Sequence, residues 1–249
     1  MARNTKEAAQ ETRNGILDTA ELVFSAKGVS RTSLSDIAEA AGVTRGAIYW
    51  HFKNKVDLFE AMMERVTLPM EEIVSAAGAS ALEDPVGYIR QCAVNVLVST
   101  AKDQRLQRVF EICCHKCEYV DDMMPLRERH VASRNVCIAQ VEQGIRNAIA
   151  NGSLPRTVDA RCAAIGMHAF IDGLIANWVL EPGYFSLGAE AGRLVDTYLA
   201  GLRGPAPLAT PTRGARNAAA RKAGAKPKAP ALTAARVAPR GRKRPPTRG

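Results

Sequence analysis

The segment Arg45–His51 combines a basic residue, aromatic rings and small residues in a pattern suited to contact with duplex DNA. In a helix that enters a groove, the N-terminal residues read base edges while flanking groups bind phosphates. Lys55 would add an ammonium beside the free backbone N–H groups at the start of the following helix, which favours a phosphate. We predict nine DNA-contacting residues: Ser33, Thr44, Arg45, Gly46, Ala47, Tyr49, Trp50, His51 and Lys55.

A second candidate site centres on one carboxylate in an apolar segment. Residues 158–180 are apolar on nearly every side of a predicted helix, and Asp172 is the exception. An acid in this setting must find a partner, become protonated or face a cavity. His168 lies one turn earlier, so two interpretations stay open: a buried ion pair, or an acid that orients a cationic or hydrogen-bonding ligand. The candidate apolar walls of such a pocket are Met62, Met63, Val66, Val96 and Phe170.

Three cysteines and a histidine cluster between positions 113 and 117, in a pattern that could bind a metal or respond to oxidation. Cys114 and Cys117 have ligand spacing, but a structural zinc site needs about four ligands, and the sequence offers no second pair. We therefore expect no metal and no cofactor, and interpret these cysteines as small buried hydrophobic residues. An oxidant-sensing thiol stays open as an alternative, because Lys116 could lower the pKa of a neighbouring thiol.

No pattern in the sequence predicts catalysis. The sequence contains no glycine-rich phosphate loop, no His-Glu-x-x-His motif and no nucleophile elbow, and its four histidines are scattered. We therefore expect a protein that is not an enzyme.

Short helices must position the DNA-contacting residues, because apolar residues recur at helical spacing almost everywhere up to Leu202. Ser33 and Asp36 form an approximate capping box at the start of one helix, and Thr44 caps the next after a tight turn at Gly42. Two short helices joined by such a turn predict a helix-turn-helix. We therefore predict an all-α protein that begins with a three-helix helix-turn-helix domain, with the aromatic rings of its third helix exposed.

Longer helices are expected in the remainder of the chain. One should start at Asn54 and be interrupted at Pro69, and others should cover residues 85–100, 104–118, 126–150, 158–180 and 188–202. Because residues 158–180 are more apolar than one copy can bury, we predict a homodimer through Val158–Leu180 and Gly188–Leu202. No apolar run reaches the roughly 20 residues of a membrane-spanning helix, so we expect no membrane partner and a cytoplasmic location.

Charge divides the chain into three parts. Residues 1–56 carry a net charge of +2, residues 57–202 carry −6, and residues 203–249 contain 13 Lys or Arg and no acid. The last part is rich in Ala, Pro and Gly and cannot bury a core, so we expect disorder. We predict a DNA-binding domain at 1–56, a helical ligand-binding and dimerisation domain at 57–202, and a disordered basic tail at 203–249.

The head of the chain resembles a known family. The segments Thr32–Ala38 and Ala41–Phe52, followed by Lys55 and Leu58, are similar to the DNA-binding domain of the TetR family, which would span residues of about 10–70. This resemblance implies an all-α homodimer that binds operator DNA. It also implies a second domain that closes over a drug-like ligand, and a ligand that releases the operator.

Within that family, Gly42–Phe52 is similar to the AcrR- and TtgR-like repressors of tripartite multidrug efflux pumps. The resemblance implies that Asp172 is an acid that lines the pocket. Where this group carries polar residues at other pocket positions, the chain has Thr67, Phe110 and Cys114, so its ligands should differ. The full predicted ligand site is Met62, Met63, Val66, Val96, Phe110, Cys114, His168, Phe170 and Asp172.

Together these features predict a ligand-responsive transcriptional repressor. It would bind an operator as a homodimer, be released by small hydrophobic or cationic inducers, and control a multidrug efflux operon. Two alternatives stay open. One is a thiol- or metal-sensing repressor of the same family, and the other is a DNA-architectural protein that acts through the basic tail without sequence preference.

Overall fold

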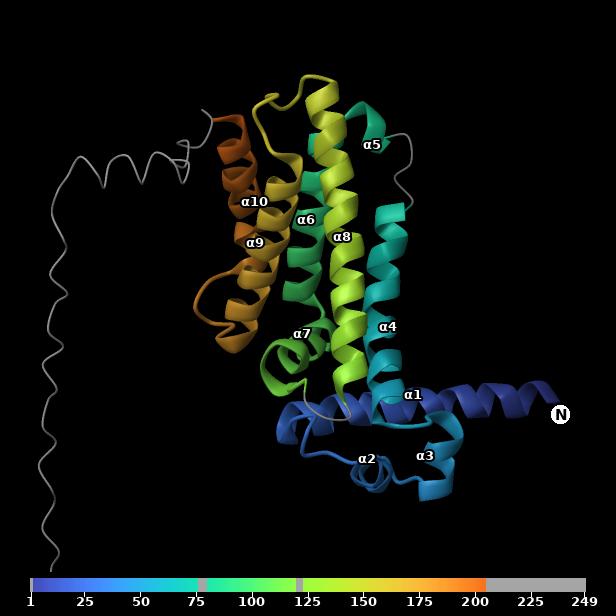
Figure 1. The fold of residues 1–249 in the computed structure, drawn as a ribbon. Helices are drawn as coiled ribbons and strands as arrows, with labels where there is room; N and C mark the ends of the chain where they lie inside the picture. The colour runs from blue at the N-terminus through green and yellow to red at the C-terminus, as the bar shows by residue number, and fades with distance from the viewer. Residues whose placement is uncertain (1, 76–79, 120–122, 205–249) are drawn as a thin grey trace, which may run out of the picture. The chain divides into compact units, whose positions relative to one another are not determined.

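The computed structural model describes residues 2–75, 80–119 and 123–204, and all regular structure within these ranges is helical, as predicted (Figure 1). The elements are α1 Ala2–Lys27, α2 Leu34–Ala40, α3 Arg45–His51, α4 Lys55–Ser75, α5 Ser80–Glu83, α6 Pro85–Lys102, α7 Gln104–Glu111, the π-helical turn η1 Ile112–Lys116, α8 Met124–Ala150, α9 Ala160–Leu180 and α10 Leu187–Arg203. Helices α6, α8, α9 and α10 form one bundle, and α1 crosses its base together with α2 and α3. Apart from its first two residues, the predicted tail lies outside the described residues.

Local contacts build the helix-turn-helix as the sequence predicted. The backbone N–H of Ser33 donates to Asp36 Oδ2 at 2.7 Å, and that of Asp36 donates to Ser33 Oγ at 3.2 Å, which completes the capping box. Thr44 Oγ1 accepts the backbone N–H of Ala47 at 3.1 Å and caps α3. Gly42 has a φ of +66° in the turn between them, a conformation that favours glycine.

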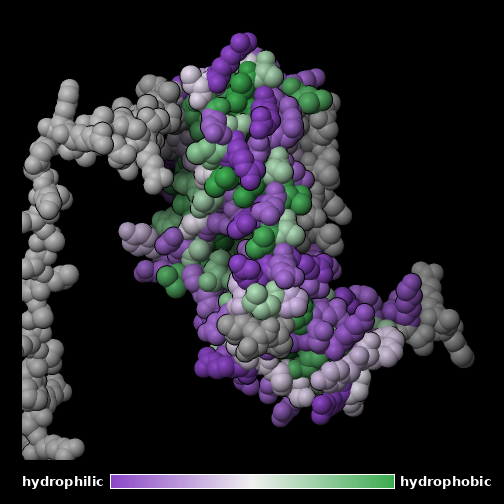
Figure 2. All heavy atoms as spheres, in the orientation of Figure 1, coloured by the Kyte–Doolittle hydropathy of each residue, from purple (hydrophilic) through white to green (hydrophobic). Residues whose placement is uncertain are grey.

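Two hydrophobic clusters meet at α7. The first cluster joins the buried side chains of α1, α2 and α3 to those of α4, α7, η1 and the start of α8. The second fills the bundle of α6, α8, α9 and α10, and Phe110 of α7 packs against both clusters. On the face shown in Figure 2, hydrophobic side chains reach the surface mainly over this bundle. The head therefore shares its core with the base of the body, and α7 connects it to the bundle.

Two predicted helices have different limits in the structure. Helix α4 continues through Pro69 to Ser75, so the expected interruption is wrong. The buried face formed by Leu58, Met62 and Val66 anchors the preceding turns, and an internal proline bends a well-anchored helix more readily than it ends it. The predicted helix 104–118 instead ends as α7 at Glu111 and continues as the π-helical turn η1.

Helix α9 corrects the expectation that no segment is long and apolar enough to cross a membrane. By length and composition its 21 residues pass that test, although a core helix of a globular protein passes it too. It contacts α7, α8, α10 and η1, and its side chains Ala164, Met167 and Ile175 are buried. One side stays uncovered in the single chain, where Ile165 is 46% exposed. This is the arrangement of a bundle helix with one apolar face left over.

Candidate DNA-binding surface and ligand pocket

The third helix presents its aromatic residues to solvent, as predicted. Ile48 is fully buried and fixes α3 against the core, whereas Tyr49 is 46% and Trp50 is 72% exposed. The guanidinium of Arg45 lies over the Tyr49 ring, 5.6 Å from its centroid. A Cβ atom at Gly46 would meet only Thr44 Oγ1, at 3.9 Å, so no crowding within the described chain explains the glycine. Its open backbone is suited to close approach by a partner.

The end of α3 is tied to α1 through a residue that the sequence analysis did not single out. Arg13 of α1 lies over the Phe52 ring, with its guanidinium carbon 5.1 Å from the ring centroid. Burial, and then the charge of Arg13, lower the pKa of His51 below its usual range. The His51 ring meets Trp50 edge-on, with centroids 4.6 Å apart. The His51 ring and the exposed Trp50 indole therefore lie together at the end of the helix.

An open hollow of about 480 Å³ lies beside α3 and brings together three of the predicted DNA contacts, Ser33, Tyr49 and Lys55. Lys55 Nζ donates to the carbonyl oxygen of Val29 at 3.1 Å, which fixes the start of α4 to the loop before α2. Arg31 and Lys53 add two cations that the prediction missed. The net positive charge of residues 1–56 is the feature of the sequence that could have indicated them. The other predicted contacts, namely Thr44, Arg45, Gly46, Ala47, Trp50 and His51, lie on or directly before α3 outside this hollow.

A buried carboxylate joins the head to the body. Glu21 of α1 has no exposed surface, and its oxygens lie 3.4 to 3.7 Å from the guanidinium nitrogens of Arg65, Arg105 and Arg108. Asp18 lies one turn before Glu21 and accepts from Arg65 at 2.6 Å and from Arg105 at 2.7 Å. Burial raises the pKa of Glu21 although the three arginines lower it. We name these five residues the Glu21 cluster.

The π-helical turn η1 makes two further connections between head and body. The ring of His115 contacts the carbonyl oxygen of Ala176 on α9 through Nε2, at 2.8 Å. The carbonyl oxygen of the next residue, Lys116, accepts the backbone N–H of buried Val29 at 2.9 Å. Consecutive residues of η1 therefore touch the bundle helix α9 and the entry to the helix-turn-helix. Single π-turns of this kind occur frequently at functional sites.

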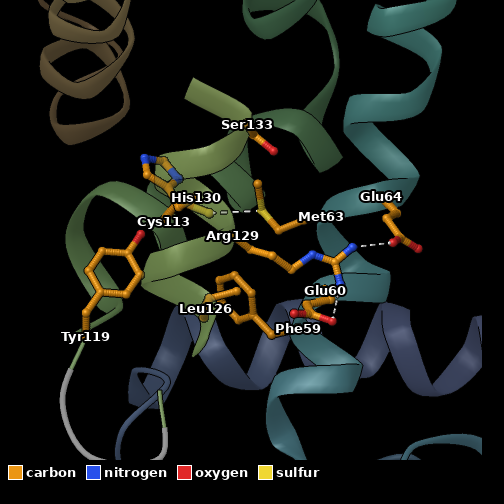
Figure 3. A pocket seen from close by; sticks show the side chains of 10 residues that line it. All are labelled: Phe59, Glu60, Met63, Glu64, Cys113, Tyr119, Leu126, Arg129, His130 and Ser133. Atoms are coloured by element: carbon orange, nitrogen blue, oxygen red, sulfur yellow. Dashed lines mark hydrogen bonds and ion pairs between the residues drawn. The ribbon is translucent and has the colours of Figure 1, made fainter. Parts of the chain in front are cut away.

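A cavity of about 120 Å³ lies between α4, η1 and α8 (Figure 3). Its apolar lining includes Phe59 and Leu126 on one side and Met63 on the other. The thiol of Cys113 contacts the Met63 sulfur at 3.1 Å. Tyr119, His130 and Ser133 complete the wall, and the tyrosine and histidine rings lie 6.1 Å apart. The cavity has the apolar lining with a few polar groups that is usual for small-molecule sites.

Three charged residues also line this cavity, namely Glu60, Glu64 and Arg129. Arg129 of α8 donates to Glu60 and, at 3.1 Å, to Glu64, both of α4 (Figure 3). Glu60 and Glu64 are one helical turn apart on α4. This spacing is visible in the sequence, but the predicted ligand site included neither acid. Arg129 and His130 carried no such signal, because only the packing of α8 on α4 brings them here, and Tyr119 reaches the cavity from the loop after η1.

The structure distributes the predicted ligand residues over several places. Met63 lines the cavity, Met62 and Val66 are buried in the first hydrophobic cluster, and Phe110 packs against both clusters. Val96 packs against the core of the bundle, and the Phe170 ring stacks on Tyr198 at 5.4 Å. Thr67 lies among residues whose side chains the structure does not describe. One cavity therefore does not unite the predicted set.

Asp172 forms the predicted pair with His168, at 3.2 Å from Oδ2 to Nδ1. Of the two interpretations that the sequence left open, a fully buried pair does not hold in the single chain, since the Asp172 side chain is 62% exposed while that of His168 is 16% exposed. The charge of Asp172 helps to raise the pKa of Cys114 on η1 and of Cys137 on α8, after the larger effect of burial. Asp172, Cys114 and Cys137 come from α9, η1 and α8 and interact electrostatically, and we call them, with His168, the second polar region.

The cysteines differ from the prediction in two respects. Cys114 is exposed rather than buried, because η1 directs Cys113 toward α4 and leaves Cys114 at the surface near α9. Burial raises the pKa of Cys113 and Cys114, and it raises that of Cys117 to about 11. The predicted lowering by Lys116 is therefore wrong, and Lys116 pairs with Glu111 at 3.6 Å instead.

No group of three or more His, Cys, Asp or Glu side chains in the described ranges is arranged to hold a metal ion. The absence of a metal and of a cofactor stays a prediction.

Comparison with known proteins identifies the family. Residues 16–62 match the profile of bacterial regulatory proteins of the tetR family, and residues 84–203 match the C-terminal region of MAATS-type transcriptional repressors. The HTH-type transcriptional regulator TtgR of Pseudomonas putida is 41% identical over 203 residues, which cover 82% of this chain and 97% of TtgR.

Two solved structures resemble the fold. NalD, the secondary repressor of the MexAB-OprM multidrug efflux pump in Pseudomonas aeruginosa, superposes with a TM-score of 0.73 and 34% identity, over 79% of this chain and 98% of NalD. The complex of triclosan with SmeT of Stenotrophomonas maltophilia gives a TM-score of 0.68 and 32% identity, over 81% of this chain and 99% of SmeT. As the motifs of its head predicted, the chain belongs to the TetR family of bacterial transcriptional regulators.

Proposed function

We propose that this protein is a cytoplasmic repressor of a multidrug efflux operon, which binds its operator as a homodimer and leaves it when a small ligand enters the body. The observation that carries the proposal is α3, a capped helix with Arg45, Tyr49 and Trp50 exposed. The similarity to NalD, described as a repressor of an efflux pump, supports the target. The three predicted domains, at 1–56, 57–202 and 203–249, are part of the proposal.

The homodimer would form through α9 and α10, within the segments Val158–Leu180 and Gly188–Leu202 that the sequence predicted. The exposed apolar side of α9 around Ile165 supports this contact, because a partner helix would cover it. A twofold dimer would place two recognition helices in successive major grooves, roughly 34 Å apart.

The ligand is proposed to be small and hydrophobic or cationic. The cavity beside α4 and the polar region around Asp172 are the two places in the body that support this. The triclosan complex of SmeT shows that a related protein binds an aromatic compound.

The oxidant-sensing alternative is less well supported, since burial raises the pKa of the thiols near η1. The architectural alternative depends on the tail, which lies outside the described residues.

Selection of duplexes from a random library, followed by footprinting, tests the proposal. We expect a protected pseudo-palindrome with half-sites about one helical turn apart. Ile165→Glu should yield monomers in analytical ultracentrifugation and lose the selected duplex. The matched control is Val136→Glu on α8, where the side chain is 59% exposed, and it should stay dimeric and bind. Selection that yields no common sequence would refute a repressor and favour the architectural alternative.

A further inference from the structure

Helix α3 is too short to hold its own position. It has seven residues, and an isolated helix shorter than about 12 residues is marginal in water. Two buried side chains four residues apart, Ile48 and Phe52, fix it to the core of the head. Ile48 lies in the middle of the helix, whereas Phe52 is its C-terminal cap and has an extended backbone. The direction of the last turn therefore depends on what packs against Phe52.

A cation from another helix covers the Phe52 ring. The guanidinium carbon of Arg13, on α1, lies 5.1 Å from the centroid of that ring. Arginine is planar and stacks on aromatic faces, and the attraction is stronger where water is excluded, as it is around the buried Phe52. Within the described residues, Arg45 also lies over a ring, but its partner Tyr49 belongs to the same helix. Arg13 is therefore the cation that ties the end of α3 to α1.

Consecutive aromatic rings extend this contact to the surface. The centroids of the Phe52 and His51 rings lie 6.2 Å apart. The His51 ring in turn meets the Trp50 indole edge-on at 4.6 Å. Trp50 is 72% exposed and is one of the predicted DNA contacts. The series from Arg13 through Phe52 and His51 to Trp50 therefore leads from α1 to the exposed side of α3.

Arg13 also acts on this series through its charge. After the larger effect of burial, the positive charge of Arg13 lowers the pKa of His51. The guanidinium is therefore close enough to disfavour a second cation on the imidazole. The protonation equilibrium of His51 consequently reports whether Arg13 occupies its place, and this measurement needs no DNA.

We propose that Arg13 is a positioning residue for DNA recognition, which covers Phe52, sets the direction of the last turn of α3 and so places His51 and Trp50 on the duplex. It acts through these rings and does not itself bind a phosphate. The effect on DNA rests on the proposed function, whereas the contact of Arg13 with the end of α3 does not.

Fluorescence anisotropy with the selected duplex measures the effect on recognition. Arg13→Met keeps a long apolar side chain over Phe52 and removes the guanidinium, so the affinity should fall roughly three- to tenfold, the range of a cation–π contact. The matched control is Lys27→Met, which removes a cation from an exposed position of the same helix and should leave the affinity near that of wild type. Equal affinities of Arg13→Met and wild type would overturn the proposal.

The dependence of affinity on salt separates positioning from a direct phosphate contact. A cation bound to a phosphate releases a counter-ion, and its removal flattens the plot of log K against log salt by about 0.9. Arg13→Met should instead keep the slope of wild type, so that its affinity is lower by the same factor at every salt concentration. A slope flatter by about 0.9 would show that the guanidinium binds a phosphate and would refute the positioning role.

A double-mutant cycle tests whether the effect passes through the aromatic rings. Trp50→Ala removes the last ring of the series. In that background Arg13→Met should cost little further affinity, because both residues serve one contact with the duplex. Arg13→Lys keeps the charge but loses the planar group, so it should restore only part of the affinity that Arg13→Met loses. Losses from Arg13→Met and Trp50→Ala that add independently in free energy would contradict the proposal.

An NMR titration of the full-length protein without DNA tests the contact itself. The chain has four histidines, and His51→Gln identifies the signal of His51 by its loss. Arg13→Met should raise the pKa of His51, since the neighbouring cation is gone, while Arg13→Lys should keep it lowered. An unchanged pKa in Arg13→Met would refute the role of Arg13 even if wild type selects a duplex. A wild type that shows the expected pKa but selects no duplex would refute the proposed function instead.

Discussion

The DNA-binding head and the ligand cavity differ in how far along the chain their contacts reach. In the head, Ser33 and Asp36 are three residues apart, as are Thr44 and Ala47. At the cavity, Cys113 contacts Met63 across 50 positions and Arg129 contacts Glu60 across 69. A surface made by neighbours in sequence can be read from motifs. A cavity made by distant helices depends on how those helices pack.

The largest effect should come from the exposed face of α3. Arg45→Ala and Tyr49→Ala should each weaken specific duplex binding by roughly 10- to 100-fold, and the double variant should abolish it, since each lost base or phosphate contact removes about 1–3 kcal/mol. Fluorescence anisotropy measures the loss, and Arg127→Ala on the exposed side of α8 is the control. Unchanged affinity in both single variants would mean that α3 does not read DNA. Locally determined contacts would then not predict the interface.

The second largest effect should arise in the Glu21 cluster, where long-range contacts hold the two regions together. Arg65→Met removes an arginine whose side chain is 18% exposed. Glu21 and Asp18 then keep their negative charges with one cation fewer beside them. We expect a loss of about 2 kcal/mol in the free energy of unfolding, measured with urea at fixed protein concentration. Arg90→Met breaks an exposed pair with Asp196 and should cost less than about 1 kcal/mol.

The same variant has a pH dependence that follows from Glu21. Because burial raises the pKa of Glu21 above 4.5, acidification protonates Glu21 at a higher pH than it protonates an exposed glutamate. The neutral carboxyl no longer requires a counter-ion. The loss in Arg65→Met should therefore be full near neutral pH and shrink as the pH falls through that raised pKa. Adding Glu21→Gln should restore part of the stability at pH 7. A loss that stays constant with pH and is not rescued would exclude Glu21 as its cause.

A smaller effect is expected for Asp172, where the predicted acid lies outside the cavity. Asp172→Asn keeps the shape and removes the charge, so the affinity for ethidium, a multi-ring aromatic cation, should fall on the order of tenfold. Fluorescence titration without DNA measures it, and the affinity for the selected duplex should stay near that of wild type. Equal ethidium affinity with a lower melting temperature would restrict Asp172 to its pair with His168.

The smallest effect on specific binding should follow from removal of the basic tail. Helix α10 ends at Arg203, so a chain that stops at Gly204 keeps every described contact. If the tail neutralises phosphates, its loss should flatten the plot of log K against log salt by about 0.9 per phosphate, most clearly for non-specific duplexes. Identical slopes for both proteins would show that the tail does not contact DNA.

The sequence predicted the helical fold and the head well because their signals are local. Capping residues, the turn at Gly42 and the burial of Ile48 each follow from a few neighbouring positions, and Tyr49 and Trp50 are exposed as expected. Arg13 was missed, since its contact with Phe52 joins two helices and leaves no pattern in either.

The body was harder to predict for the same physical reason. Its helices carry apolar residues at the expected spacing, but spacing does not reveal which helices meet. The π-helical turn η1 was also missed, and it decides that Cys113 faces α4 while Cys114 lies at the surface. Asp172 was singled out as an acid in an apolar segment, but its exposure in the single chain was not predicted.

The hydrogen bond from Val29 to Lys116 gives the molecule a built-in reporter of contact between head and body. The amide of Val29 can exchange with deuterated solvent only when the head separates from η1, because Val29 is buried there and its N–H is bonded to η1. The amide of Phe52 is bonded to Ile48 within the head, so it reports opening of the head at α3. Faster exchange at Val29 than at Phe52 would therefore indicate that the head detaches from η1 as an intact unit. The measurement needs no label on DNA or ligand.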